Sequence, residues 1–239
     1  MESNDHPDLV HLAPRFASRE RLRKAYHTTK LIALKPVHHF TIPAQPWLDP
    51  EALDCFTELT AAARNYLEYG SGGSTVFASQ HVSHLVSVDS DRYFLRDVQR
   101  RLLELNPPAE TKLIHANIGM TELWGRPVFT RHTPRRLRHW QAYPKAPWDQ
   151  YRAIGIEPDL ILVDGRFRVA CVLESLRSLR KDGVTILVDD YLTRPHYKAV
   201  EEFADLCAMQ GRMAVLRRKA NIDHDRLLAA LRLAYLDHR

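Results

Sequence analysis

The sequence predicts an α/β protein built on a mostly parallel sheet, with helices on both faces and a helical or irregular N-terminal extension. Three observations lead to this prediction. Short apolar runs alternate with longer runs whose apolar residues have helical spacing. A glycine-rich turn directly follows the first apolar run, and later runs end in aspartate. Alternating strands and helices of this kind form parallel sheets, whose strands end at one common edge.

Length and composition fit one domain with an extension. A chain of 239 residues, 45% hydrophobic and 26% charged, can bury a sizeable core. We expect the extension over residues 1–60 and the main domain over residues 61–239. No apolar run approaches the ~18 to 20 residues of a membrane span, and the N-terminus lacks a signal-peptide pattern, which predicts a cytoplasmic protein without a membrane partner. Three distant cysteines give neither a disulfide framework nor a metal clip.

The expected elements follow in chain order. Within the extension, a polar segment, a basic helix and a proline-rich connector are predicted over residues 1–15, 17–28 and 36–50. Predicted strands cover residues 66–69, 85–88, 112–116, 159–164, 184–190 and 212–218. Predicted helices cover residues 50–63, 92–105, 169–179, 196–209 and 223–238, and another begins at residue 74. Residues 117–158 are predicted to form a long irregular connection.

The segment from Tyr66 to Asp89 is typical of a nucleotide-binding βαβ unit. Three glycines form a tight turn between strand and helix, and backbone without side chains lets a ligand approach closely. The second strand delivers Asp89 at its carboxyl end, 19 positions after Gly70. A carboxylate there can accept both hydroxyls of a ribose, so Asp89 is the predicted ribose ligand. Neighbouring candidates for cofactor contacts are Gly70, Ser71, Gly72, Ser74 and Ser90.

The glycine pattern separates two nucleotide classes. Dinucleotide folds favour G-x-G-x-x-G, which packs a pyrophosphate against the helix N-terminus. Here two glycines are adjacent, and Glu68 precedes the turn, where its charge suits a sulfonium and an amino group better than a pyrophosphate. The segment E-x-G-x-G-G resembles the first motif of class I S-adenosylmethionine-dependent methyltransferases. This resemblance implies S-adenosylmethionine as cofactor, with Glu68 among its contacts. The glycine pattern disfavours a nicotinamide oxidoreductase. The alternative is an ordinary glycine turn without a ligand.

Acids also end the fourth and fifth predicted strands. Asp164 ends the fourth strand, and the pair Asp189 and Asp190 ends the fifth. Three carboxylates at one edge would repel each other, and a hard cation such as Mg²⁺ would relieve that repulsion. The alternative is that these aspartates only form turns.

This arrangement resembles the metal-dependent O-methyltransferases of the catechol, caffeoyl-coenzyme A and macrocin types, over roughly residues 64–209. The resemblance implies that Asp164, Asp189 and Asp190 hold a divalent ion that positions an acceptor hydroxyl, with Asp164 also a catalytic candidate and a cofactor contact. More closely, LEYGSGGST, NIG…WGRP and VDGRFRVAC together resemble a group of uncharacterised bacterial methyltransferase-like proteins. The helical C-terminal segment puts in doubt the antiparallel final strand that many methyltransferases carry.

Two departures from those families leave the catalytic base and one cofactor contact open. Phe167 stands where catechol-type enzymes place a lysine base; His115 or His196 could take the proton instead, and no base is assigned. Asn117 stands where related proteins often carry an aspartate near the adenine. It could contact the adenine or cap a turn at Gly119.

Basic and aromatic segments bear on the acceptor. Residues 131–140 carry four arginines, which could hold phosphates, carboxylates or nucleic acid, or simply form a solvated surface. Arg166 and Arg168 could bind an anionic substrate. Residues 142–148, with two tryptophans nearby, could line an acceptor pocket or anchor a long loop.

The sequence therefore predicts an S-adenosylmethionine-dependent methyltransferase that acts, with metal assistance, on a hydroxyl of a polar or anionic small molecule or a sugar. One alternative is a cofactor-binding module without catalysis, which the missing lysine and Asn117 permit. Another is a nucleic-acid methyltransferase, although VDGRFR lacks the Asn/Asp-Pro-Pro-aromatic signature of base N-methylation.

Overall fold

The unit that carries the candidate site is Phe40–Arg239. The computed structural model describes residues 23, 26, 29–30 and 32–238. The predicted polar segment 1–15 lies outside them, as does most of the predicted helix 17–28, of which positions 23 and 26 are helical. None of the helices in the described residues has the length and apolar character that a membrane crossing requires.

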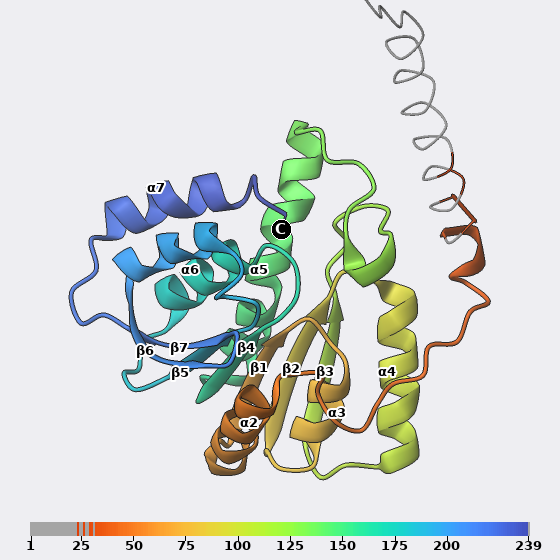
Figure 1. The fold of residues 1–239 in the computed structure, drawn as a ribbon, viewed down its shortest axis with the longest axis horizontal. Coiled ribbons are helices and arrows are strands. Elements are labelled where there is room, and N and C mark those ends of the chain that lie inside the picture. The colour runs from red at the N-terminus through yellow and green to blue at the C-terminus, as the bar shows by residue number, and fades with distance from the viewer. Residues whose placement is uncertain (1–22, 24–25, 27–28, 31, 239) are drawn as a thin grey trace, which may run out of the picture. The chain divides into compact units, whose positions relative to one another are not determined.

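A seven-stranded sheet forms the centre of this unit (Figure 1). In spatial order, its strands are β3 (Glu110–His115), β2 (His84–Asp89), β1 (Asn65–Tyr69), β4 (Leu160–Val163), β5 (Thr185–Val188), β7 (Met213–Arg218) and β6 (Ala204–Gln210). The first five pair in parallel, whereas β7 is antiparallel to both β5 and β6. The mostly parallel sheet is thus confirmed, and the antiparallel strand that the sequence left in doubt is present.

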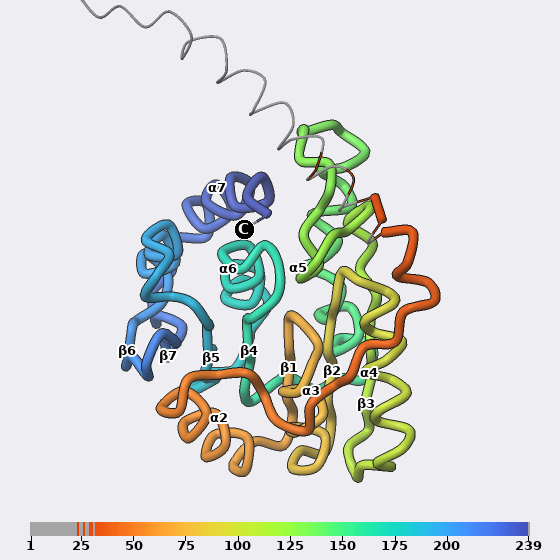
Figure 2. Tube along the Cα trace, turned by 45° about the vertical axis from the view of Figure 1, so that its right-hand side comes forward, coloured from red at the N-terminus to blue at the C-terminus, as the bar shows by residue number. Residues whose placement is uncertain are grey.

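Helices cover both faces of the sheet, as predicted (Figure 2). They are α2 (Pro50–Ala62), α3 (Gly73–Ser79), α4 (Arg92–Leu105), α5 (Pro134–Ile154), α6 (Arg168–Ser178) and α7 (His224–Ala234), with 3₁₀ helices η1 (Leu123–Gly125) and η2 (Pro195–Glu202). On one face, Tyr66 and Leu85 pack with α2 and α3; on the other, Leu67 and Tyr69 pack with α5, α6 and α7. This division follows from the alternation of side chains along each strand.

Capping residues set the limits of the two long helices near the site. The Asp91 carboxylate accepts two backbone hydrogen bonds in the first turn of α4, and Thr133 does the same once for α5. Asn106 and Gly155 adopt the left-handed conformation and end these helices. Helix α4 begins three residues after β2 ends, at the edge of the sheet where the parallel strands finish.

The connection between β3 and β4 contains a long helix where the sequence predicted an irregular segment. Helix α5 runs through Pro144 and Pro147, although an internal proline removes a backbone hydrogen bond. One face of the helix is held against the sheet by four buried aromatic residues, Trp140, Tyr143, Trp148 and Tyr151. The Tyr151 hydroxyl, for example, donates to the carbonyl oxygen of Tyr66 at 2.8 Å. Burial of this aromatic face stabilises the helix despite the prolines.

The predicted helix over residues 196–209 is also wrong. The 3₁₀ helix η2 is followed by strand β6, which forms a hairpin with β7 around Gly211. Gly211 has a φ of +56°, a conformation that favours glycine at a chain reversal. Pairing with β7 overrides the helical spacing of the apolar residues in this segment.

Candidate functional site

The predicted site residues are brought to one edge of the sheet. Gly70 follows β1, Asp89 ends β2, Asn117 lies two residues after β3, Asp164 follows β4 and Asp189 follows β5. Because these five strands are parallel, their carboxyl ends lie at the same edge. The arrangement that the sequence predicted for these residues is therefore present.

The turn after β1 is fixed against the turn after β4. Gly70 has a φ of +97°, and a Cβ there would lie 2.7 Å from the backbone nitrogen of Gly165. A Cβ on Gly73 would overlap the backbone of Gln45. Gly72, by contrast, has nothing within 4 Å of the position that a Cβ would occupy. The turn is thus packed at its ends and open at Gly72, where a ligand can approach the backbone.

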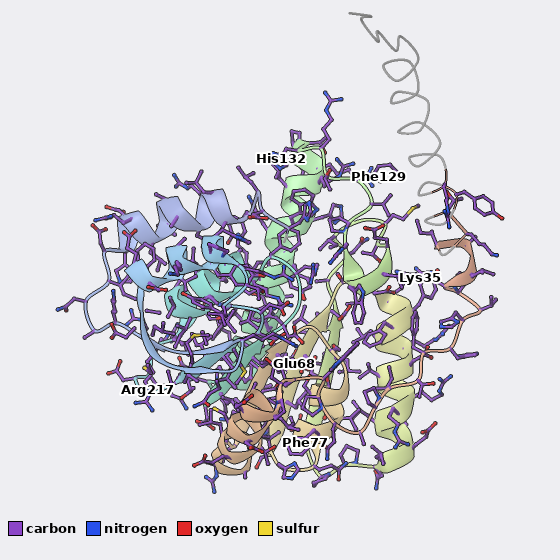
Figure 3. The ribbon with its side chains drawn as sticks, viewed as in Figure 1. Lys35, Glu68, Phe77, Phe129, His132 and Arg217 are labelled. Atoms are coloured by element: carbon purple, nitrogen blue, oxygen red, sulfur yellow. The ribbon has the colours of Figure 1, made fainter. Side chains whose placement is uncertain are left out.

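Glu68 lies inside the molecule, near the beginning of α3 (Figure 3). Its carboxylate accepts hydrogen bonds from the hydroxyls of Ser74 and Thr75, from Ser87 at 2.7 Å and from Tyr66 at 3.2 Å. Burial raises the pKa of Glu68 to about 7, although these hydrogen bonds oppose the rise. Glu68 and Ser74 therefore connect the sheet to the glycine turn, and their cofactor contacts stay predictions.

The Asp89 carboxylate, half-buried at the end of β2, links two turns. Its Oδ2 accepts from the backbone N–H of Ser71 at 3.1 Å, and its Oδ1 accepts from the backbone N–H of Asp91 at 2.7 Å. Burial raises the pKa of Asp89 to about 6, against the effect of these hydrogen bonds. Near neutral pH the group is charged, and a carboxylate can accept further hydrogen bonds beside these two. These are the properties that a ribose ligand needs.

Ser90 and Asn117 take part in turns next to Asp89. The buried Ser90 hydroxyl donates to the carbonyl oxygen of Gly125 at 3.0 Å. The Asn117 side-chain oxygen accepts from the backbone N–H of Gly119 at 2.9 Å. This is the turn that the sequence offered as the alternative to an adenine contact. Cofactor contacts of Ser90 and Asn117 stay predictions.

Arg168, at the beginning of α6, binds all three aspartates that were expected to hold a metal. It is 3% exposed, and its Nη2 donates to Asp164 Oδ1 at 2.8 Å. Its Nη1 donates to the backbone oxygen of Asp189 and lies 3.3 Å from Asp190 Oδ2. Burial raises the pKa of Asp164, and the positive charge of Arg168 opposes that rise. The guanidinium thus ties the ends of β4 and β5 together.

Two further arginines complete this network. The Nε of Arg212 lies 3.1 Å from both Asp189 Oδ1 and Asp190 Oδ1, and its Nη1 lies 2.8 Å from Asp49 Oδ1. The Nη2 of Arg194 lies 2.9 Å from Asp190 Oδ2. Within the described residues, no three or more His, Cys, Asp or Glu side chains have the arrangement of a metal site. Because arginines already neutralise the aspartates, this donor set does not fit the Mg²⁺ that the sequence predicted.

The sequence interpretation missed Arg194, Arg212 and Asp49. Arg194 lies four positions after Asp190, so its pairing was visible as a short spacing. The hydrogen bond between Asp49 and Arg212 joins residues 163 positions apart, and no local pattern predicts it. The folded topology alone brings that pair together.

The turn after β4 is held in a strained conformation. Phe167 has a φ of +55°, which is uncommon for a residue with a bulky side chain. Its buried ring lies 5.5 Å from the ring of Trp140 and 5.9 Å from that of Tyr143, between ring centroids. This packing keeps the preceding residue, Arg166, in one place at the edge of the sheet.

The tryptophans between β3 and β4 have different environments. Trp140 is buried in α5 and donates to the carbonyl oxygen of Ile118 at 3.3 Å, so it anchors the helix. Trp124 is 67% exposed and pairs with Trp47, which is 78% exposed, at 5.8 Å between ring centroids. Residues 142–148 lie within α5 and not in a loop, and a contact of their aromatic side chains or of Trp124 with an acceptor stays a prediction.

The two histidine candidates for the catalytic base lie on different elements. His115 ends β3, and partial burial lowers its pKa, so it is neutral near pH 7. His196 lies in η2, where its Nε2 is 4.0 Å from Asp237 Oδ2. Neither histidine is therefore assigned as the base.

Known structures place the chain in a family. The chain matches no family model and no curated protein. It is 33% identical to a methyltransferase-like protein from Silicibacter pomeroyi, over 83% of this chain and 100% of that one, with a TM-score of 0.71. Lower similarity is found to a methyltransferase from Geobacter sulfurreducens (14% identity, 90% and 92% of the two chains, TM-score 0.48) and to an O-methyltransferase from Bacillus cereus (13%, 81% and 90%, 0.47). The chain belongs to the family of this methyltransferase-like protein, and it has a Rossmann-like methyltransferase fold.

Proposed function

We propose that this protein binds S-adenosylmethionine and transfers its methyl group to a hydroxyl oxygen of a polar small molecule. The observation that carries the proposal is the position of Asp89. Its carboxylate lies 3.1 Å from the backbone nitrogen of Ser71, in the turn whose next residue, Gly72, has open space beside it. A charged acceptor next to an open glycine backbone suits a nucleoside with an attached amino acid.

The residues at the edge of the sheet fit this cofactor. Asp89 would accept both ribose hydroxyls, and the backbone at Gly72 would lie against the rest of the cofactor. Asn117 would contact the adenine, with Ser90 nearby. When bound, S-adenosylmethionine supplies a methyl group on a positively charged sulfur, which an oxygen nucleophile can attack in line.

Asp164 is our candidate for the residue that takes the acceptor's proton. Its side chain is 35% exposed at the end of β4, and burial raises its pKa, which strengthens it as a base. With the cofactor bound, the acceptor oxygen would form a bond to the methyl carbon as the carbon–sulfur bond breaks. The hydroxyl proton passes to Asp164. Arg168, 2.8 Å away, would hold the carboxylate in position.

Metal assistance is not part of the proposal. The aspartates that could hold an ion are paired with Arg168, Arg194 and Arg212. The segment after β4 also lacks the signature of base N-methylation, which favours a small-molecule acceptor over nucleic acid.

The test is a turnover assay with purified protein. S-Adenosylmethionine is incubated with a panel of phenols, sugars and hydroxy acids, with EDTA or Mg²⁺, and S-adenosylhomocysteine is measured by mass spectrometry. We expect product with at least one class of acceptor in both conditions. Asp164→Asn should lower kcat with little change in cofactor affinity. No turnover on the panel, combined with tight cofactor binding, would favour the module without catalysis.

A further inference from the structure

Arg166 is a buried cation without a partner. The residue is 7% exposed, and its Nε is enclosed without a hydrogen bond. Among the described residues, its side chain makes neither an ion pair nor a hydrogen bond; only its backbone does, with the Tyr143 hydroxyl at 3.4 Å and the Cys171 thiol. Buried charges in proteins are normally paired, so this guanidinium is an exception that calls for a ligand.

The neighbours of Arg166 do not neutralise it. Burial lowers its pKa, and the positive charges of Arg168 and Arg126 add to that effect. Asp164 is the carboxylate in the same turn, but it pairs with Arg168 at 2.8 Å. Tyr197, whose buried hydroxyl also lacks a hydrogen-bond partner within the described residues, is near enough to affect Arg166 electrostatically. Within the described residues, no carboxylate therefore forms an ion pair or a hydrogen bond with the Arg166 guanidinium, although its charge helps to hold down the pKa of Asp164.

Two non-glycine residues near Arg166 have a strained backbone. Phe167, the next residue, is left-handed with a φ of +55°. Trp124 is left-handed with a φ of +61°, and a Cβ on its neighbour Gly125 would lie 4.0 Å from Arg166 Cγ. Strained residues gather at ligand sites, where the surrounding fold holds them in place. The surrounding fold thus holds Arg166 in place, although its side chain takes part in none of the ion pairs of the described residues.

Arg168 shows what a structural arginine looks like in the same turn. It is equally buried, yet its guanidinium contacts Asp164, Asp189 and Asp190. The two arginines are two positions apart and differ only in this respect. Arg168 therefore links the ends of β4 and β5, whereas the guanidinium of Arg166 is available to a ligand.

We propose that Arg166 is a binding subsite for a carboxylate group of a ligand at the edge of the sheet. The planar guanidinium offers a fork of N–H donors that matches the two oxygens of a carboxylate. The proposal rests on the proposed function and names the chemistry at that site. The carboxylate can belong to the amino acid part of the cofactor or to an anionic acceptor.

The experiment compares wild type with Arg166→Met, Arg166→Lys and a control, Arg135→Met, which removes an exposed charge from α5. Three titrations are made at constant ionic strength. The ligands are S-adenosylhomocysteine, 5′-methylthioadenosine, which has no carboxylate, and acetate added to protein saturated with S-adenosylhomocysteine. The exposed Trp124 offers a fluorescence signal, and calorimetry gives the affinities.

Each source of the carboxylate predicts its own result. If the cofactor supplies it, Arg166→Met should weaken S-adenosylhomocysteine at least tenfold and leave 5′-methylthioadenosine unchanged. If the acceptor supplies it, the cofactor affinities should stay the same and acetate binding should be lost. In either case, Arg166→Lys should restore part of the affinity, and Arg135→Met should behave like wild type. Unchanged binding of all three ligands by Arg166→Met would overturn the proposal.

Failure of the proposed function would look different. Wild type would then bind neither nucleoside, while acetate, titrated alone, would still bind in a manner that needs Arg166. Thermal stability provides a second check. Because Arg166→Met removes an unpaired buried charge, its Tm should equal that of wild type or exceed it by up to about 3 °C. A fall in Tm well beyond that of Arg135→Met would show that Arg166 has a structural partner, and would also overturn the proposal.

Discussion

The backbones of Gly70 and Gly165 are in close contact where β1 and β4 end. A Cβ on Gly70 would lie 2.7 Å from the nitrogen of Gly165, and a Cβ on Gly165 would lie 2.8 Å from the nitrogen of Gly70. This close approach fixes the glycine turn relative to the turn that carries Asp164 and Arg166. The proposed cofactor and acceptor sides of the site are therefore parts of one rigid arrangement.

Two alanine substitutions separate folding from binding in this turn. Gly70→Ala should lower the Tm by about 5 °C or more, because it adds a backbone clash to a positive φ. Gly72→Ala should leave the Tm unchanged, since nothing lies within 4 Å of its Cβ, but it should weaken S-adenosylhomocysteine binding. Thermal unfolding and calorimetry measure both effects. If Gly72→Ala binds like wild type, the open side of the turn is not where the ligand lies.

Asp89→Ala should lower the affinity for S-adenosylhomocysteine by on the order of 100-fold, because two charge-assisted hydrogen bonds to the ribose would be lost. Affinity should also fall below about pH 6, as the carboxylate is protonated. Asp91→Ala is the matched control. Asp91 caps α4, so its loss should cost about 1 kcal/mol of stability with little change in affinity. Equal affinities for wild type and Asp89→Ala would remove the ribose assignment.

Glu68 should make the protein more stable as the pH falls from about 8 to 5. Burial raises its pKa in the folded state to about 7, above its ordinary 4.5, so folding takes up a proton. The contribution of Glu68 to the free energy of unfolding is complete below about pH 4.5, declines as the pH rises, and is gone above about pH 7. It amounts to roughly 3 kcal/mol at most. Urea unfolding of wild type and Glu68→Gln at several pH values measures it. The variant should have a shallower slope, and parallel curves would refute the assignment.

The fold was predictable from the sequence where local pattern and final structure agree. The strands predicted at residues 66–69, 85–88, 159–164 and 184–190 from their apolar residues are present as β1, β2, β4 and β5. Helix α5 was hidden because Pro144 and Pro147 break its pattern. Its aromatic residues at positions 140, 143, 148 and 151 have the spacing of one helical face, and that signal could have revealed it. Strand β6 depends on pairing with β7, which propensity does not encode.

The location of the candidate site was predictable from the sequence, but the pairing of its aspartates with arginines was not. The residues that end parallel strands converge by topology, and Asp89 and Asp164 are at the predicted edge. The sequence could not show that arginines would satisfy the acids. Arg212 reaches Asp189 from the hairpin between β6 and β7, a contact that depends on a strand order in which β7 lies beside β5.

Arg168→Met should destabilise the protein by about 3 to 5 kcal/mol, because it removes the buried guanidinium that pairs with Asp164 and Asp190. Arg194→Met is the matched control. It removes one part-exposed pair with Asp190 and should cost under about 1 kcal/mol.

The same variants test the role of the network in place of a metal. Mg²⁺ should leave the Tm of wild type unchanged relative to EDTA. Arg168→Met should gain stability with Mg²⁺, because the ion would neutralise the acids that have lost Arg168. Stabilisation of wild type by Mg²⁺ would contradict the account of the aspartates.

The most direct test of the central claim, that this edge of the sheet binds S-adenosylmethionine, is a calorimetric titration of the full chain with S-adenosylhomocysteine, in Mg²⁺ and then in EDTA. We predict saturable binding with one site and the same affinity in both conditions. Absence of binding in both would contradict the claim and reduce Asp89 and the glycine turn to features of the scaffold.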